Sequence, residues 1–176
     1  MTAIAMIIAP EEFQDKEYSI PKQIFKDEGF SVATFSTRRG EVTGTNNATA
    51  DADQSLEEMD PSLFQAVFLV GGNGARIFFD DKILHDHLRT FAGSGKVTAA
   101  ICISPNTLAN AGLLEGRQAT CVPDEEIIEN LASKGAKYTG LAVTIDLPIV
   151  TASGPAAAGE CAREIVNILK DSEEKK

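Results

Sequence analysis

The stretch that decides the fold is VTAAICISP, at residues 97–105. Its first half, through Ile101, is short and almost entirely apolar, which is typical of a buried strand in a parallel sheet. Its second half supplies Ser104 and Pro105, residue types that suit the N-cap and the first position of a helix. The stretch therefore predicts a strand, a sharp turn at Cys102 and a helix in direct succession.

Apolar runs and amphipathic segments alternate on both sides of this stretch. Buried strands are predicted at residues 3–9, 30–35, 66–70, 96–102, 141–145 and 148–151. Helices are predicted at residues 15–28, 80–91, 105–111, 124–133 and 156–170, with Pro21 delaying or bending the first of them. This alternation predicts an α/β fold, a three-layer flavodoxin-like sandwich whose mainly parallel sheet has helices on both faces. We expect a single domain over residues 1–170 and a solvated tail at 171–176.

Composition narrows the possible partners and cofactors. The 176 residues carry 16 basic and 26 acidic side chains, a net charge of −10, which argues against nucleic acid or an anionic membrane as partner. The apolar run at residues 3–10 is too short to span a membrane. With three cysteines and two histidines, a disulfide framework or a zinc site is not expected. We expect no metal, no cofactor and a cytoplasmic location.

Two of the predicted strands end in residues that suggest chemistry. In parallel sheets, functional groups gather at the carboxyl ends of strands, and here one strand ends in Gly71-Gly72 and another in Cys102. A thiol between a strand and a helix N-terminus resembles a nucleophile elbow, and the helix would favour its thiolate. The backbone N–H groups of Ile103 and Gly72 would then form an oxyanion hole. The alternative is a cysteine that only packs in the core.

Four segments together resemble the ThiJ/PfpI superfamily, which shares the class I glutamine amidotransferase-like fold. The segments are FQDKE at residues 13–17 continuing to Gly29, FLVGGNGA at 68–75, AAICISPNTLANAGLLEGR at 99–117, and VTASGP at 150–155. The resemblance implies that Cys102 is the elbow nucleophile and that Gly72 donates to the oxyanion hole. It also places the acidic partner of that cysteine at Gln14, where this chain has an amide.

The chain departs from the superfamily where a histidine is expected. Ile103 stands where the PfpI peptidase-like branch has a histidine, and residues 119–123 lack the histidine found in the branch of the parkinsonism-linked protein. Ser153 replaces an arginine that often precedes Gly-Pro. His85 and His87 are expected to be structural, with His87 on the apolar side of its helix and His85 nearer solvent.

Two further acidic residues keep an alternative open. Glu11 and Glu12 precede the amide at Gln14, and either would restore a carboxyl if the turn brought it to the thiol. Otherwise Gln14 can donate a hydrogen bond but cannot exchange protons near neutral pH. The loss of general acid/base chemistry would then slow turnover by about 10²–10⁴-fold.

These residues predict a reactive, oxidisable Cys102 with impaired hydrolytic turnover and a stress- or redox-related role. One alternative is a cysteine-dependent hydrolase of the peptidase or amidase type, or a glyoxalase- or deglycase-like enzyme. Another is a chaperone-like or scaffold protein. The resemblance implies a homodimer or larger homo-oligomer, and a small carbonyl compound or peptide as the possible substrate.

Overall fold

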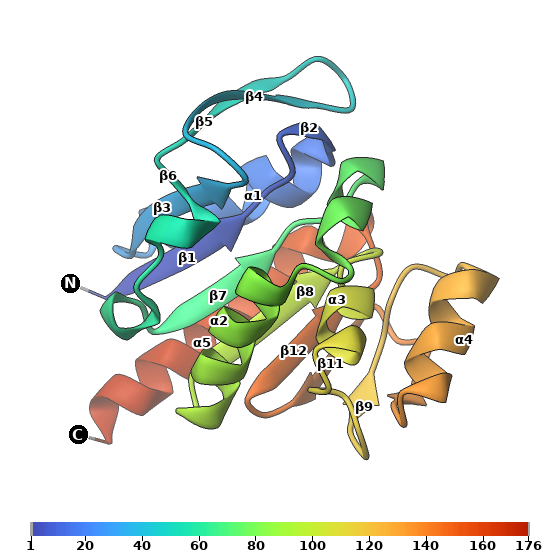
Figure 1. Ribbon diagram of the computed structural model, residues 1–176. Helices are drawn as coiled ribbons and strands as arrows, with labels where there is room; N and C mark the ends of the chain where they lie inside the picture. Colours follow the sequence, from blue (N-terminus) through green and yellow to red (C-terminus); the bar gives the residue numbers. More distant parts are fainter. Residues whose placement is uncertain (1, 176) are drawn as a thin grey trace.

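A seven-stranded sheet runs through the centre of the computed structural model, which describes residues 2–175 (Figure 1). Its strand order is β11-β12-β8-β7-β1-β3-β6, and every neighbouring pair is parallel except β11 with β12. The strands are β1 (Ala3–Ile7), β3 (Ser31–Ser36), β6 (Gln54–Ser55), β7 (Ala66–Leu69), β8 (Val97–Ile101), β11 (Val143–Asp146) and β12 (Ile149–Ala152). The predicted mainly parallel α/β sheet is confirmed.

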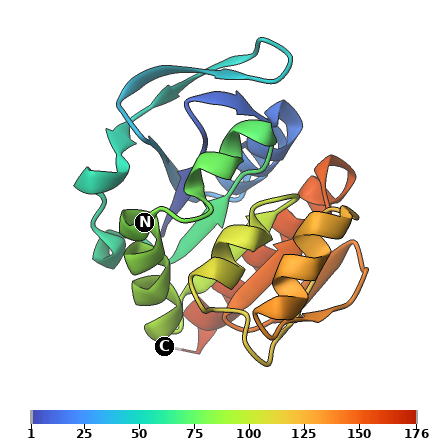
Figure 2. The ribbon, with the colours of Figure 1, turned by 45° about the vertical axis from the view of Figure 1, so that its right-hand side comes forward.

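Helices cover both faces of this sheet (Figures 1 and 2). Helices α1 (Asp15–Asp27) and α5 (Ala158–Glu174) pack together on one face, and α2 (Lys82–Gly93) and α3 (Pro105–Asn110) lie on the other. Helix α4 (Glu125–Ser133) packs beside α3. Short 3₁₀ helices lie between these elements: η1 (Leu56–Glu58), η2 (Pro61–Leu63), η3 (Asn73–Phe78) and η4 (Pro155–Ala157).

Two small sheets flank the main one. The strand β2 (Glu11–Phe13) pairs with the hairpin β4 (Gly40–Gly44) and β5 (Thr49–Ala52), which stands over the top of the molecule in Figure 1. The strands β9 (Gln118–Ala119) and β10 (Lys137–Tyr138) form a parallel pair beside β11. Residues 38–60 thus contain short strands and turns.

The central strands are almost entirely apolar because both of their faces are covered, with Thr98 in β8 and Thr151 in β12 as buried polar exceptions. Every residue of β7 and β8 is buried. Phe68 of β7 meets Phe25 of α1 edge to face, with the ring centroids 6.1 Å apart. This pair joins the sheet to the helix that carries part of the site described below.

The structure changes two details of the predicted helices. Pro21 does not delay the start of α1, because the helix runs without interruption from Asp15 to Asp27 and buries Pro21. At the other end of the chain, α5 continues to Glu174, past the predicted end at residue 170, and its last residues are exposed. Of the predicted tail, residue 176 lies outside the described residues.

The register of β7 and β8 brings the two candidate segments together. Leu69 lies opposite Ala100, so the continuation of β7 at Gly71 reaches the level of Cys102 at the end of β8. Because the strands are parallel, both turns leave the sheet at the same edge. The fold therefore places the glycine turn beside the cysteine.

Replacing Phe68 by alanine should lower the free energy of unfolding by about 3–5 kcal/mol, because it leaves a cavity between β7 and α1. Urea denaturation measures this change. Leu63→Ala is the matched control, since Leu63 is 67% exposed and its truncation should cost less than about 0.5 kcal/mol. Equal losses in the two variants would contradict the assignment of the core.

Candidate functional site

Cys102 occupies a sharp turn between β8 and α3. Its φ of 64° lies in the left-handed region, which costs a residue with a side chain about 1–3 kcal/mol. Hydrogen bonds on both sides hold this conformation: the Cys102 N–H donates to the Ala152 carbonyl at 2.9 Å, and the Val122 N–H donates to the Cys102 carbonyl at 2.9 Å. The thiol is half-buried at the carboxyl edge of the sheet. This is the geometry of a nucleophile elbow.

Two backbone N–H groups are directed at the sulfur, those of Gly72 and Ile103. Gly72 has a φ of 97°, and a Cβ there would lie 2.4 Å from the Glu12 carbonyl oxygen and 2.5 Å from the Gln14 nitrogen. Only glycine therefore permits this turn. The two residues expected to form an oxyanion hole thus lie together at Cys102.

A carboxyl group that the sequence prediction missed lies beside the thiol. Glu17, in the first turn of α1, is fully buried and its Oε2 accepts the Gly71 N–H at 2.8 Å. A Cβ on Gly71 would lie 2.5 Å from Glu17 Oε2 and 2.6 Å from the Cys102 Cβ. The carboxyl and the cysteine side chain therefore approach each other across a residue that has no side chain of its own.

The assignment of the partner position to Gln14 is therefore wrong. Gln14 is the N-cap of α1, and its Oε1 accepts the N–H groups of Lys16 at 2.8 Å and Glu17 at 2.9 Å. Helical periodicity places Glu17 on the inward face with Pro21 and Phe25, four and eight residues later. That periodicity was the signal in the sequence that pointed to Glu17.

Glu11 and Glu12, which were considered as replacements for the missing acidic partner of Cys102, do not have that role. Glu11 and Glu12 are both exposed, and Glu12 has a φ of 54° within the irregular strand β2, where its carbonyl oxygen lies close to Gly72. Impaired turnover was expected because neither a carboxyl nor a histidine would reach Cys102. Glu17 removes the first of these grounds, because its carboxyl lies beside the thiol.

Burial and charge couple the two ionisable groups of the site. Burial raises the pKa of Glu17 to about 7, against the lowering effects of the Gly71 N–H and of Cys102. Burial, followed by the negative charge of Glu17, raises the pKa of Cys102 to about 12, while the N–H groups of Gly72 and Ile103 lower it. The expected lowering of the thiol pKa is thus outweighed, first by burial and then by the charge of Glu17. When Glu17 is protonated its charge disappears, so the pair titrates as a unit.

Both histidines lie in α2 and bond backbone carbonyls. His85 is buried and its Nε2 donates to the Phe79 carbonyl at 2.9 Å, whereas the half-buried His87 donates to the Leu56 carbonyl at 2.8 Å. The predicted orientation was the reverse, because α2 starts at Lys82 and its phase turns Leu84, His85 and Leu88 inward. Neither ring is among the groups that act on Cys102.

The other two thiols are buried, Cys121 after β9 and Cys161 in α5. Within residues 2–175, no group of three or more His, Cys, Asp or Glu side chains is arranged to hold a metal ion. No helix in the same part of the chain is long and apolar enough to cross a bilayer.

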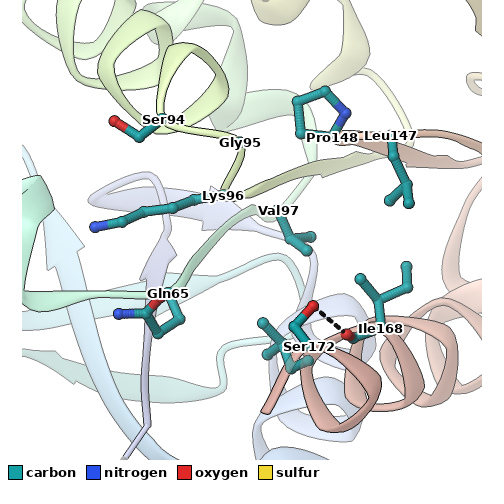
Figure 3. A pocket seen from close by; sticks show the side chains of 10 residues that line it. Gln65, Ser94, Gly95, Lys96, Val97, Leu147, Pro148, Ile168 and Ser172 are labelled. Atoms are coloured by element: carbon teal, nitrogen blue, oxygen red, sulfur yellow. Dashed lines mark hydrogen bonds between the residues drawn. The ribbon is translucent and has the colours of Figure 1, made fainter. Parts of the chain in front are cut away.

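A cavity at the other end of the sheet is separate from this site. Its volume is ≈ 490 Å³, and Figure 3 shows the side chains that surround it, among them Lys96, Val97, Leu147, Pro148, Ile168 and Ser172. Val97 begins β8, whereas Cys102 follows its end. The coupled carboxyl, thiol and N–H groups, and not cavity size, identify the candidate active site.

Glu17→Gln should speed alkylation of Cys102 by iodoacetamide at pH 8 by about tenfold or more, because it removes a negative charge that opposes the thiolate. The rate is measured by intact mass, with Cys102→Ala to correct for Cys121 and Cys161. An unchanged or slower rate would show that the Glu17 charge does not act on the sulfur.

Glu17→Gln should also change how stability depends on pH. The raised pKa of Glu17 means that the folded chain binds more protons than the unfolded chain between pH 4.5 and about 7. Wild-type stability should therefore fall relative to the variant as pH rises through this window, by about 3 kcal/mol. Urea denaturation at several pH values tests this, with the exposed Glu11→Gln as control; parallel curves for wild type and Glu17→Gln would contradict it.

Comparison with known proteins identifies the family to which the chain belongs. The DJ-1/PfpI family matches residues 2–168. A deglycase of Pyrococcus abyssi is 31% identical over 94% of this chain and 98% of its own, and protein/nucleic acid deglycase 2 of Escherichia coli is 31% identical over 94% and 96%. The crystal structure of a ThiJ/PfpI domain protein from Brachyspira murdochii superposes with a TM-score of 0.92 at 29% identity, over 96% of each chain. The chain belongs to the DJ-1/PfpI family.

Proposed function

We propose that this protein is a cysteine-dependent enzyme of the glyoxalase or deglycase type, acting on small 1,2-dicarbonyl compounds and their early adducts with amines. The observation that carries the proposal is the buried Glu17 carboxyl beside the half-buried thiol of Cys102. A nucleophile and an acid/base group in contact are the minimum for addition to a carbonyl followed by proton transfer. Two relatives named as deglycases support the same chemistry.

The first step forms a bond between Cys102 Sγ and the aldehyde carbon. The thiol proton passes through Glu17 to the carbonyl oxygen, which gives a hemithioacetal. If that carbon instead carries an amine adduct, the amine leaves and takes the proton. The N–H groups of Gly72 and Ile103 stabilise the negative charge that develops on oxygen.

The second step moves hydrogen between the two carbons. Glu17 removes the proton from the carbon bonded to sulfur and returns a proton to the neighbouring carbon, while the hydroxyl proton on the first carbon passes to the carbonyl oxygen of the second. The first carbon is thereby oxidised to a thioester while the second is reduced to an alcohol, so no external oxidant is needed. Water then hydrolyses the thioester, which releases a 2-hydroxy acid and the free thiol.

The pKa of Glu17, about 7, suits both directions of this proton transfer. Amide hydrolysis by a cysteine usually relies on an imidazole to protonate the leaving amine. In residues 2–175 both imidazoles are instead bonded to carbonyls around α2. A peptidase function therefore has less support than a glyoxalase or deglycase function.

Conversion of methylglyoxal to lactate tests the proposal. Cys102→Ala should abolish turnover and Glu17→Gln should reduce kcat by about 10²–10⁴-fold, although the same change speeds alkylation of the thiol. Glu11→Gln, which alters an exposed carboxyl beside the same turn, should leave turnover unchanged.

Three outcomes would overturn the proposal. Turnover that persists in Cys102→Ala would show that Cys102 is not the nucleophile. An inactive wild type whose Cys102 is converted by peroxide to sulfinic acid supports the redox role, and inactivity without selective oxidation supports a scaffold. Sedimentation of the same samples tests the predicted homo-oligomer.

A further inference from the structure

Three hydrogen bonds form a closed circuit behind Cys102. The Gln14 N–H donates to the Gly71 carbonyl at 3.0 Å, the Gly71 N–H donates to Glu17 Oε2 at 2.8 Å, and the Glu17 N–H donates to Gln14 Oε1 at 2.9 Å. Each of the three residues is both donor and acceptor. The circuit therefore fixes the start of α1, the glycine turn and the Glu17 side chain relative to one another.

This circuit distinguishes the two oxygens of the Glu17 carboxyl. Oε2 is occupied by Gly71, whereas Oε1 is buried and has no conventional hydrogen-bond partner. A buried carboxyl oxygen without a partner is costly unless it carries or exchanges a proton. The circuit thus leaves one defined oxygen for proton exchange with the thiol.

We propose that Gln14 is a positioning residue, which holds Glu17 with Oε2 on the Gly71 N–H and leaves Oε1 as the oxygen that exchanges a proton with Cys102. The inference rests on the proposed function only in taking Glu17 as the acid/base group. Gln14 touches neither sulfur nor substrate in this role. It acts through the backbone N–H of Glu17.

The amide of Gln14 suits this role better than a carboxylate does. Both can accept the two N–H groups at the start of α1, and a carboxylate usually caps a helix well. A second negative charge beside buried Glu17, however, would raise the pKa of Glu17 further. The amide provides the cap without adding that charge.

Substitutions at position 14 should shift the pKa of Glu17 in opposite directions. Gln14→Ala breaks the circuit and lets water reach Glu17, so its pKa should fall towards the ordinary range. Gln14→Glu keeps a cap but adds charge, so the pKa of Glu17 should rise. Gln14→Asn keeps a neutral acceptor and should retain the wild-type value.

The test is the rate of Cys102 alkylation by iodoacetamide from pH 5 to 9. The plot of this rate against pH changes slope at the pH where Glu17 ionises, because the new negative charge opposes the thiolate. We expect the bend to move down by about half a pH unit or more in Gln14→Ala, up by a similar amount in Gln14→Glu, and little in Gln14→Asn. If Gln14→Ala does not fold, the other two variants are compared. An upward shift in Gln14→Glu but not in Gln14→Asn supports the proposal, and equal profiles in the two variants contradict it.

The matched control is Asp81→Ala, which removes the N-cap of α2, where Asp81 Oδ1 accepts the Leu84 N–H at 2.9 Å. It should lose stability to a similar extent as Gln14→Ala but keep the wild-type pH profile. If the pH dependence of alkylation were the same in Gln14→Ala and Asp81→Ala, Gln14 would act only as a helix N-cap and the proposal would be overturned. Because alkylation needs no turnover, a shifted profile in a protein inactive on methylglyoxal would reject the proposed function alone.

Discussion

The absence of a side chain at Gly71 is the constraint on which the site depends. Glu17 Oε2 and the Cys102 Cβ each lie within 2.6 Å of the point where a Cβ at Gly71 would stand. The Gly71 N–H then holds the carboxyl in the space that glycine leaves free. A buried acid, a nucleophile and a backbone donor can thus meet at one edge of the sheet, where desolvation makes their mutual effects on protonation large.

Packing elsewhere in the molecule supports this arrangement. Helix α1 is held by its contact with α5 and by Phe25 against Phe68 of β7, the strand that leads into Gly71. The left-handed conformation of Cys102 is held by Ala152 of β12 and by Val122. Two helices, two strands and a loop that are distant in sequence therefore fix the positions of the two side chains. Hydrogen bonds from neighbouring segments offset the local strain at the elbow.

The chemistry follows from which proton acceptors are buried near sulfur. The chain has no histidine at Ile103 or Val122, and its two imidazoles are bonded within the α2 region. Glu17 is left as the group able to move protons at Cys102, and burial brings its pKa to about 7. A carboxyl in this state suits carbonyl addition and proton transfer between carbons, whereas peptide hydrolysis ordinarily needs an imidazole.

The sequence by itself determined the α/β architecture, the elbow at Cys102 and the glycine turn, because short apolar runs, helix caps and glycine positions act locally. It also contained the periodicity that places Glu17 inward with Pro21 and Phe25. Only the tertiary structure decided that this inward face meets Gly71 and Cys102, and that Gln14 faces the helix end instead. The reason is that the phase of α1 relative to the sheet is set by its packing against α5 and β7, which no local pattern encodes.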